Sequence, residues 1–177
     1  LLAAGVDIEA ADSNEERALY HAARDGNFFV VDTLLAAGAH TEAPNKEGLT
    51  ALLAACSGGH STVVRRLCEA KANVNTRAKE GSTPLLVACQ RGDLDVVESL
   101  LAAGAETETT DTRTGKTSLL IASDKGHIEM VETLLAAGAN VNTRAKGGAS
   151  PLLVACRRGD SHIVSSLLVA EADTEAT

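Results

Sequence analysis

Aromatic side chains are almost absent from this sequence. They make up 2% of it, as Tyr20, Phe28 and Phe29, and there is no tryptophan. Base-stacking platforms and aromatic cofactor pockets are built from such rings, so the sequence argues against both, and we expect no cofactor. Apolar residues still account for 45% of the chain, with alanine and leucine filling the role of larger side chains, which is enough to bury a core.

An excess of positive charge and a long apolar run are also lacking. Sixteen Lys and Arg against 24 Asp and Glu give a net charge of −8, which argues against nucleic acid as a partner. Apolar runs are as short as residues 119–122, so no membrane insertion is expected. The chain opens without Met and without a basic stretch before an apolar segment, so we expect no signal peptide and a fragment of a longer protein.

Cysteine and histidine show no ligand or disulfide pattern. The spacing of Cys56, Cys68, Cys89 and Cys156 matches no dense secreted framework, so we expect reduced thiols and an intracellular, cytoplasmic setting. No two histidines stand at i and i+4, and Cys-x-x-Cys does not occur, so we expect no metal site.

An internal repeat is the strongest signal in the sequence. Five leucines step along the chain by 33, 33, 34 and 33 residues, at Leu19, Leu52, Leu85, Leu119 and Leu152. Each is followed by a glycine and then by a block of branched apolar residues and leucines. We expect a single array over 1–177, with repeats at 13–45, 46–78, 79–111, 112–145 and 146–177 after the tail of a truncated repeat at 1–12.

Each unit predicts two short helices. A hydroxyl stands before the leucine, where a helix N-cap must accept a free backbone N–H, at Thr50, Thr83, Thr117 and Ser150. Pro84 and Pro151 follow at the first helical position. After the glycine, apolar residues at i, i+1, i+4 and i+5, as in 130–135, form one face of a second helix. Because two short helices cannot bury that face alone, the units must stack into an all-α solenoid.

The repeat resembles a known family. Residues 80–85 (Glu-Gly-Ser-Thr-Pro-Leu), 125–131 (Lys-Gly-His-Ile-Glu-Met-Val) and 134–142 (Leu-Leu-Ala-Ala-Gly-Ala-Asn-Val-Asn) resemble successive parts of the ankyrin repeat signature. The resemblance covers nearly the whole chain. It implies stacked antiparallel helix pairs with projecting β-hairpin-like loops, and protein binding through the concave side made by the loop tips and the first helices.

The chain departs from the family pattern at two kinds of position. Glu15, Arg17 and Ala18 stand where the family has Gly, Thr and Pro, so the first loop and N-cap should be weaker or differently shaped. Lys71 and Glu171 occupy the glycine position that closes the second helix, where a side chain in the left-handed region costs roughly 1 kcal/mol. We therefore expect those two helices either to carry this strain or to close differently.

A second peculiarity is an internal duplication. Residues 73–89 and 140–156 agree at 14 of 17 positions, so a block of two repeats looks duplicated. The family's usual histidine after Thr-Pro-Leu is replaced by tyrosine or leucine in every repeat. Apolar packing is therefore expected in place of its polar contact.

No motif carries recognisable catalytic chemistry. Residues 111–117 end like a phosphate-binding loop, but Thr110 stands where the first glycine is required, and a repeat loop with one inserted residue explains the segment. Neither Gly-x-Ser-x-Gly nor His-Glu-x-x-His occurs. Cys56, Cys89 and Cys156 share one place late in the first helix, where small buried residues are expected. We therefore expect a non-catalytic protein.

The side expected to bind partners is unusually basic. At loop tips and exposed positions of the first helices, the last four repeats carry Lys46, Arg77, Lys79, Arg91, Arg113, Lys116, Lys125, Arg144, Lys146, Arg157 and Arg158. Acidic residues at such places are Glu47, Glu80, Asp111 and Asp124. Acidic residues gather instead on the second helices, at Asp93, Asp95, Glu98, Glu129 and Glu132. The solenoid should therefore have one basic and one acidic face.

We interpret the eleven basic residues, called the basic strip below, as the surface that recognises an acidic segment or face of a protein partner. The expected function is a scaffold or adaptor. Alternatives are a structural subunit of a large assembly, whose terminal repeats are covered by further repeats or a neighbouring subunit, and a regulatory domain attached to an enzyme or channel. The resemblance also implies asparaginyl hydroxylation at Asn75 and Asn142, which follow valine at the loop entry.

Overall fold

The computed structural model describes residues 6–175, without the side chains of residues 171–175. Residues 1–5 of the expected 1–12 tail and residues 176–177 lie outside the described part. Ten helices are formed in the described range: α1 (Ala18–Arg24), α2 (Phe28–Ala36), α3 (Ala51–Gly58), α4 (Ser61–Glu69), α5 (Pro84–Arg91), α6 (Leu94–Ala102), α7 (Ser118–Lys125), α8 (Ile128–Ala136), α9 (Pro151–Arg158) and α10 (Ser161–Glu175). Over this range, no helix combines the length and the hydrophobicity needed to cross a bilayer.

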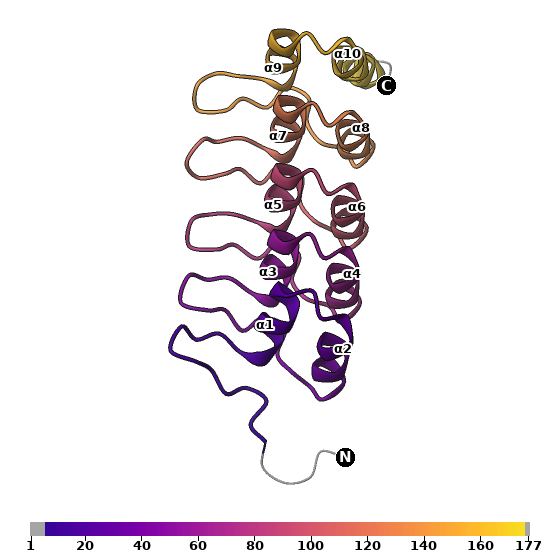
Figure 1. The fold of residues 1–177 in the computed structure, drawn as a ribbon. Coiled ribbons are helices and arrows are strands. Elements are labelled where there is room, and N and C mark those ends of the chain that lie inside the picture. Colours follow the sequence, from indigo (N-terminus) through magenta and orange to yellow (C-terminus); the bar gives the residue numbers. More distant parts are fainter. Residues whose placement is uncertain (1–5, 176–177) are drawn as a thin grey trace.

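The helices form a row of stacked pairs (Figure 1). Within each pair an odd-numbered helix contacts the even-numbered helix that follows it. Between pairs, odd-numbered helices contact odd-numbered ones and even-numbered helices contact even-numbered ones. The loops project from the side of the odd-numbered helices that faces away from the even-numbered ones. The predicted all-α solenoid of helix pairs is confirmed, and isolated antiparallel bridges, Ala11 with Arg17 and Thr110 with Thr117, show the hairpin-like character of two loops.

The odd-numbered helices begin and end where the sequence indicates. The N-cap hydroxyls accept the backbone N–H three residues later at 3.3 to 3.4 Å, in Thr50, Thr83, Thr117 and Ser150. A left-handed glycine ends each of these helices, with φ between 73° and 91°. In α1 the N-cap Arg17 makes no side-chain capping bond, and Glu15 is left-handed at φ 63°. The first loop and cap are thus the atypical ones, as expected.

The two positions that lack the closing glycine behave differently. Lys71 adopts φ 65° and closes α4 as a glycine would, in spite of its side chain. At Glu171 the chain does not close, because α10 continues through it to Glu175. Continuing the helix avoids the cost of a left-handed side chain. The last pair of the described stack therefore ends in a longer helix and not in a loop.

The core lies between successive pairs. Leu53, Leu86 and Leu120, which replace the family's histidine, are 0 to 4% exposed, whereas the equivalent Leu153 of the last described pair is 49% exposed. The same difference separates the cysteines, because Cys56 and Cys89 are fully buried and Cys156 is exposed. The prediction of a buried Cys156 is therefore wrong, since within the described residues no pair packs onto α9. Burial raises the pKa of the Cys89 thiol to about 12 and raises that of Cys56 as well.

Candidate partner-binding surface

Hydrogen bonds join neighbouring loops into a ribbon, and at three junctions these bonds are between backbone groups. Within a loop, Asn45 N–H donates to Leu49 O at 2.9 Å, and Gly48 at φ 79° makes the tight turn between them. Between loops, a lysine N–H at the tip donates 3.0 Å to the carbonyl of the loop before it, from Lys46 to Asn14, Lys79 to Glu47 and Lys146 to Thr114. The three lysines are therefore held in register along the ribbon.

One junction of the ribbon is built differently. The loop before α7 contains the inserted residue that lengthens this repeat, and there the Thr112 hydroxyl donates to Glu80 O at 2.6 Å. A Cβ added to Gly81, in the loop before α5, would lie 2.2 Å from the Thr112 methyl carbon. The contact between these two loops therefore requires glycine at position 81. The side chain of Thr112 thus takes the place of the lysine N–H found at the other junctions.

Two arginines of the basic strip tie one pair to the next. Arg91 Nη1 donates to Ser57 O at 2.8 Å, Nη2 donates to Gly58 O at 3.4 Å, and Nε lies 2.7 Å from a carboxylate oxygen of Asp93. Arg158 Nη1 donates to Asp124 O at 2.9 Å in the same way. These contacts satisfy carbonyls at the end of the preceding odd-numbered helix, which have no partner inside that helix. This structural role of the two arginines is not evident from the sequence pattern.

Histidines fill the same place at the other junctions. His60 Nε2 lies 2.9 Å from Arg24 O, and its ring covers Gly26. The ring of His127 covers Gly92, as Arg91 covers Gly59. The sequence carried a signal for this alternation, because His follows the helix-ending glycine in one repeat and Arg-Gly-Asp spans it in the next.

The rest of the strip divides into bonded and unbonded side chains. Arg77 Nη1 donates to Gly81 O at 3.3 Å and to Thr110 O at 3.4 Å, and Lys116 Nζ lies 2.6 Å from Asp124. Arg144 and Lys146 also donate to loop carbonyls. Side chains without a hydrogen bond or ion pair in the described part of the chain are Lys46, Lys79, Arg113, Lys125 and Arg157. All of the strip is exposed except Lys116, which is half-buried.

A shallow groove lies on this side, between the loops and α5 and α7. Its volume is about 480 Å³. Leu86, Val87 and Ile121 contribute apolar side chains, and Arg113 and Lys116 contribute positive charge. Asp111 also lines the groove, and because Leu86 and Ile121 are buried, Val87 is its partly exposed apolar side chain.

The acidic residues lie mostly on the other side. Asp95 and Glu98 on α6, and Glu129 and Glu132 on α8, are exposed on the even-numbered helices, which stand away from the loops (Figure 1). Asp93 was expected with them, but it precedes α6 and pairs with Arg91. That expectation is wrong for Asp93, because the N-cap position points its carboxylate toward the end of α5.

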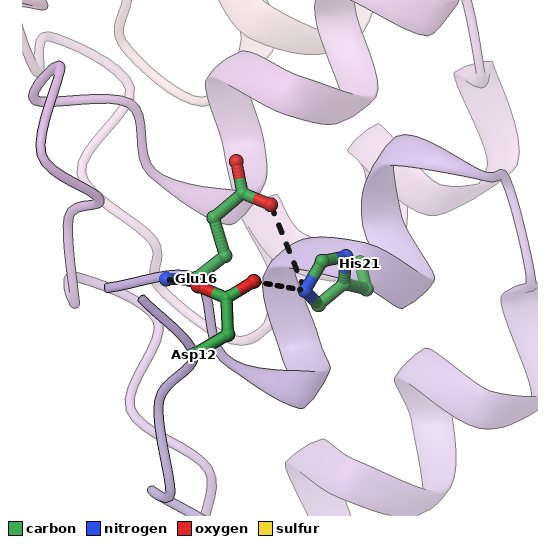
Figure 2. A group of neighbouring side chains, drawn as sticks. All are labelled: Asp12, Glu16 and His21. Carbon is green, nitrogen blue, oxygen red and sulfur yellow. Dashed lines mark hydrogen bonds and ion pairs between the residues drawn. The ribbon is translucent and has the colours of Figure 1, made fainter. Parts of the chain in front are cut away.

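A cluster of three titratable side chains closes the atypical first loop (Figure 2). His21 Nε2 lies 3.5 Å from Asp12 and 3.6 Å from Glu16. The other Asp12 oxygen accepts the N–H groups of Glu16 and Asn14, which lowers the Asp12 pKa. The donor set suits a divalent cation, but Arg24 Nη1 lies 3.6 Å from the same Glu16 oxygen and already supplies positive charge. The cluster therefore links the loop to α1, where a capping hydroxyl is missing.

The two asparagines at the loop entry have different surroundings. Asn75 Oδ1 accepts Glu106 N–H at 2.9 Å and its Nδ2 donates to Gly104 O at 3.2 Å. At other junctions a glutamate accepts the equivalent N–H at 2.9 Å, namely Glu9 from His40, Glu42 from Asn73 and Glu108 from Asn140. The Asn142 side chain is exposed and makes no such bond among the described residues, since α10 replaces the loop that would supply the donor.

Comparison with protein families identifies the repeat. The family described as Ankyrin repeats (3 copies) matches residues 1–78, 19–113 and 71–145. This chain belongs to the ankyrin repeat family. Ankyrin repeats are generally protein–protein interaction modules and are typically non-catalytic. A comparison with curated proteins finds no match.

Proposed function

We propose that this ankyrin array is a non-catalytic scaffold or adaptor that binds a protein partner through the basic strip. The observation that carries the proposal is the separation of charge. In the last four repeats, exposed lysines and arginines outnumber exposed carboxylates such as Glu47 and Glu80 at the loop tips and the ends of the odd-numbered helices, while further exposed carboxylates lie on α6 and α8, away from the loops. A chain with a net charge of −8 thus presents one positive face.

The strip contains two kinds of residue with respect to a partner. The five unbonded side chains, exemplified by Lys125 and Arg157, can reach a partner without breaking an existing contact. Arg91 and Arg158 hold the stack together and contribute their charge from fixed positions. Contact with a partner therefore rests on the unbonded group, and the bonded group shapes the field around it.

An acidic segment is the partner chemistry that this surface favours. The strip lacks tyrosine and tryptophan, which usually anchor interfaces, so charge guides encounter and sets specificity. Between exposed groups such attraction is screened by salt within about 8 Å at physiological ionic strength. Partner binding should accordingly weaken as salt concentration rises.

The test is affinity capture with a pair of charge-matched variants. The strip variant carries Lys125→Glu and Arg157→Glu, and the control carries Arg65→Glu and Lys71→Glu, which are exposed at a depression between α4 and α6. Native and control arrays should retain the same proteins at low salt, and the strip variant should lose them. Capture of an unchanged set by the strip variant at low salt would remove the proposal.

A second candidate function is a structural subunit of a large assembly. Apolar side chains are exposed on the last described pair, with Leu168 51% and Val169 61% accessible besides Leu153. We propose that further repeats or a neighbouring subunit cover them. Co-purification with other chains in fixed stoichiometry, insensitive to the strip variant, would favour this candidate over the adaptor.

We propose an intracellular, cytoplasmic setting on the basis of the thiols. Cys56, Cys68, Cys89 and Cys156 are all free. The two fully buried ones serve as small apolar side chains, a use that needs no oxidising compartment. Alkylation of intact cells before lysis should find all four reduced; a disulfide at any of them would contradict this setting.

Hydroxylation is proposed for the asparagines at the loop entry, with Asn142 as the preferred site. Its exposed amide is unbonded among the described residues, whereas that of Asn75 holds two backbone groups of the next repeat. Mass spectrometry of the protein from cells should find one added oxygen atom on the Asn142 peptide in larger yield than on the Asn75 peptide. Equal or reversed yields would contradict this preference.

A further inference from the structure

The last described pair exposes one half of the junction that joins every pair to the next. At the internal junctions, Leu53, Leu86 and Leu120 are 0 to 4% exposed, since a further pair packs against them. The equivalent Leu153 on α9 is 49% exposed, and Leu168 on α10 is 51% exposed. The apolar side chains of this surface, called the end face below, are Leu153, Cys156 and Leu168.

The first described pair exposes the other half of the same junction. Val30 on α2 is 49% exposed, and Leu34, one helical turn further on, is half-buried. We call these two side chains the start face. The side chains at the register of Val30 in the later pairs are at most 2% exposed, namely Val63, Val96, Met130 and Ile163. The two faces lie at opposite ends of the row (Figure 1).

The hydrogen bonds between loops also have an open half at each end. At the first junction Lys46 N–H donates to Asn14 O at 3.0 Å. By repeat register, Ser13 N–H in the first loop corresponds to Lys46 N–H, and Gly147 O in the last loop corresponds to Asn14 O. Within the described residues neither group has a backbone partner. The first loop therefore offers the donor, and the last loop the acceptor, of one more such bond.

Charge is of opposite sign at the two ends on the loop side. Residues 7–25 contain six carboxylates and two arginines, whereas residues 140–160 contain four basic residues and one acidic residue. The exposed members are Asp7, Asp12, Glu15 and Asp25 at the first end and Arg144, Lys146, Arg157 and Arg158 at the last. Since stacked helices lie about 10 Å apart, such charges would attract each other across a junction. The net charge of −8 opposes other orientations.

We propose that the end face binds the start face of a second copy of this chain, so that copies stack head to tail. The new junction repeats the apolar packing and the loop hydrogen bond of the internal junctions, and opposite charges orient it. Because the two contacting faces differ, each added copy leaves an open face at both ends, and growth does not stop at a dimer.

This inference rests on the second candidate function, the structural subunit, and identifies its neighbouring subunit. The basic strip stays accessible in the stack, since it runs along the side of the row and the contact is made at the ends. Stacking therefore lengthens the strip and does not compete with the adaptor function.

The test is sedimentation velocity of the native array at increasing concentration and low salt. Species heavier than the 18.2 kDa chain should form and grow with concentration, and added salt should reduce them. Leu153→Glu with Leu168→Glu blocks the end face, and Val30→Glu blocks the start face. Each variant alone should stay at the mass of one chain. A mixture of the two has one intact face of each kind, so it should form a dimer and nothing larger.

A control and a replacement variant complete the experiment. Phe29→Glu changes a side chain that is 84% exposed, at a register that is exposed in all five pairs, so this variant should assemble as the native array does. Glu15→Lys with Asp25→Lys alters the charge beside the start face and replaces Val30→Glu if circular dichroism shows that variant to be unfolded. It too should stay at the mass of one chain.

Three outcomes would overturn the inference. They are a native array that keeps the mass of one chain at every concentration, a mixture of the two blocked variants that does not dimerise, and a dimer formed by either blocked variant alone. An array of one-chain mass that co-purifies with other chains in fixed stoichiometry would keep the subunit function and exclude a second copy as the neighbour. Loss of partners by the strip variant concerns the adaptor function alone.

Discussion

Arg91 donates to the carbonyl oxygen of Ser57, 2.8 Å away in the preceding repeat. With Gly58 O and Asp93 as further partners, the guanidinium joins two helix pairs at a place where the sequence suggested only a surface charge. The contact is partly exposed, so its contribution is that of an accessible charged hydrogen bond.

Replacing Arg91 with alanine should lower the free energy of unfolding by about 1 kcal/mol. Urea denaturation followed by circular dichroism measures this loss as a lower midpoint. Arg157→Ala is the matched control, because the Arg157 side chain is exposed and unbonded in the described structure, and its midpoint should stay that of the native array. Equal midpoints for the two variants would refute the structural role of Arg91.

Gly81→Ala should destabilise the array more than Gly148→Ala. Both glycines are left-handed, at φ 83° and 76°, so each variant costs about 1 kcal/mol of backbone strain. Only at Gly81 would the new Cβ meet the Thr112 side chain, whereas nothing lies within 4 Å of it at Gly148. Thermal melts of the two variants compare them directly, and a larger loss at Gly148 would contradict the geometry.

Arg17→Thr should leave the first repeat more stable than Arg17→Ala does. The backbone at Arg17 has φ −103° and ψ 167°, close to the Thr83 N-cap, but its side chain caps nothing. A hydroxyl there gains about 1 kcal/mol over Arg17→Ala, which loses the same contact to Glu9 and supplies no acceptor. Hydrogen exchange of the α1 amides measures the difference in stability between Arg17→Thr and Arg17→Ala. Equal protection of these amides in the two variants would show that no cap forms.

The four thiols should react with iodoacetamide at pH 8 in the order of their exposure. Cys156 should react first and Cys68, which is half-buried and has a pKa raised by burial, should react more slowly. Cys56 and Cys89 should react only when the stack opens, since burial raises both pKa values. Peptide mass spectrometry after timed labelling gives the order, and early labelling of Cys89 would contradict the packing.

Asp111→Asn should cost more stability at neutral pH than in acid. Hydrogen bonds from Thr114 N–H and Oγ1, at 2.6 and 2.8 Å, lower the Asp111 pKa in the folded protein. A lowered pKa contributes stability above the unfolded value, about 3.9, and this contribution is lost as pH falls through the folded pKa. Urea midpoints of native and variant arrays should therefore differ at pH 7 and converge in acid. A difference that stays constant with pH would show that the ionised Asp111 carboxylate does not contribute this stability.

The fold was predictable from local sequence signals, because the same helix-capping and helix-ending residues recur in successive repeats. The hydroxyls of Thr50 and Ser150 and the glycines after the odd-numbered helices act within one turn, so they are readable from sequence alone. The exposure of Cys156 and Leu153 was not readable in this way. Their burial depends on whether another pair packs against them, and the pattern within their own repeat is the same as elsewhere.

The candidate surface was predicted in composition but not in its internal contacts. The sequence places basic residues at the loop tips, yet it does not show that Arg91 and Arg158 reach back to carbonyls 33 or 34 residues earlier. The meeting of Asp12, Glu16 and His21 was missed for a related reason, because a loop and a helix bring together residues that match no ligand spacing. Predicting contacts between elements requires knowing how the elements pack, in addition to the sequence pattern of each one.

The alternation of histidine and arginine at the junctions restricts how such an array can change length. His60 and His127 each cover the helix-ending glycine of the preceding repeat. Arg91 and Arg158, in the repeats that follow these two, cover the corresponding glycine in the same way. Removing or copying two consecutive repeats keeps the His/Arg alternation over these glycines, whereas changing the array by a single repeat puts an unfamiliar side chain over an unfamiliar turn. Growth and shrinkage in steps of two are therefore the changes that this architecture tolerates best.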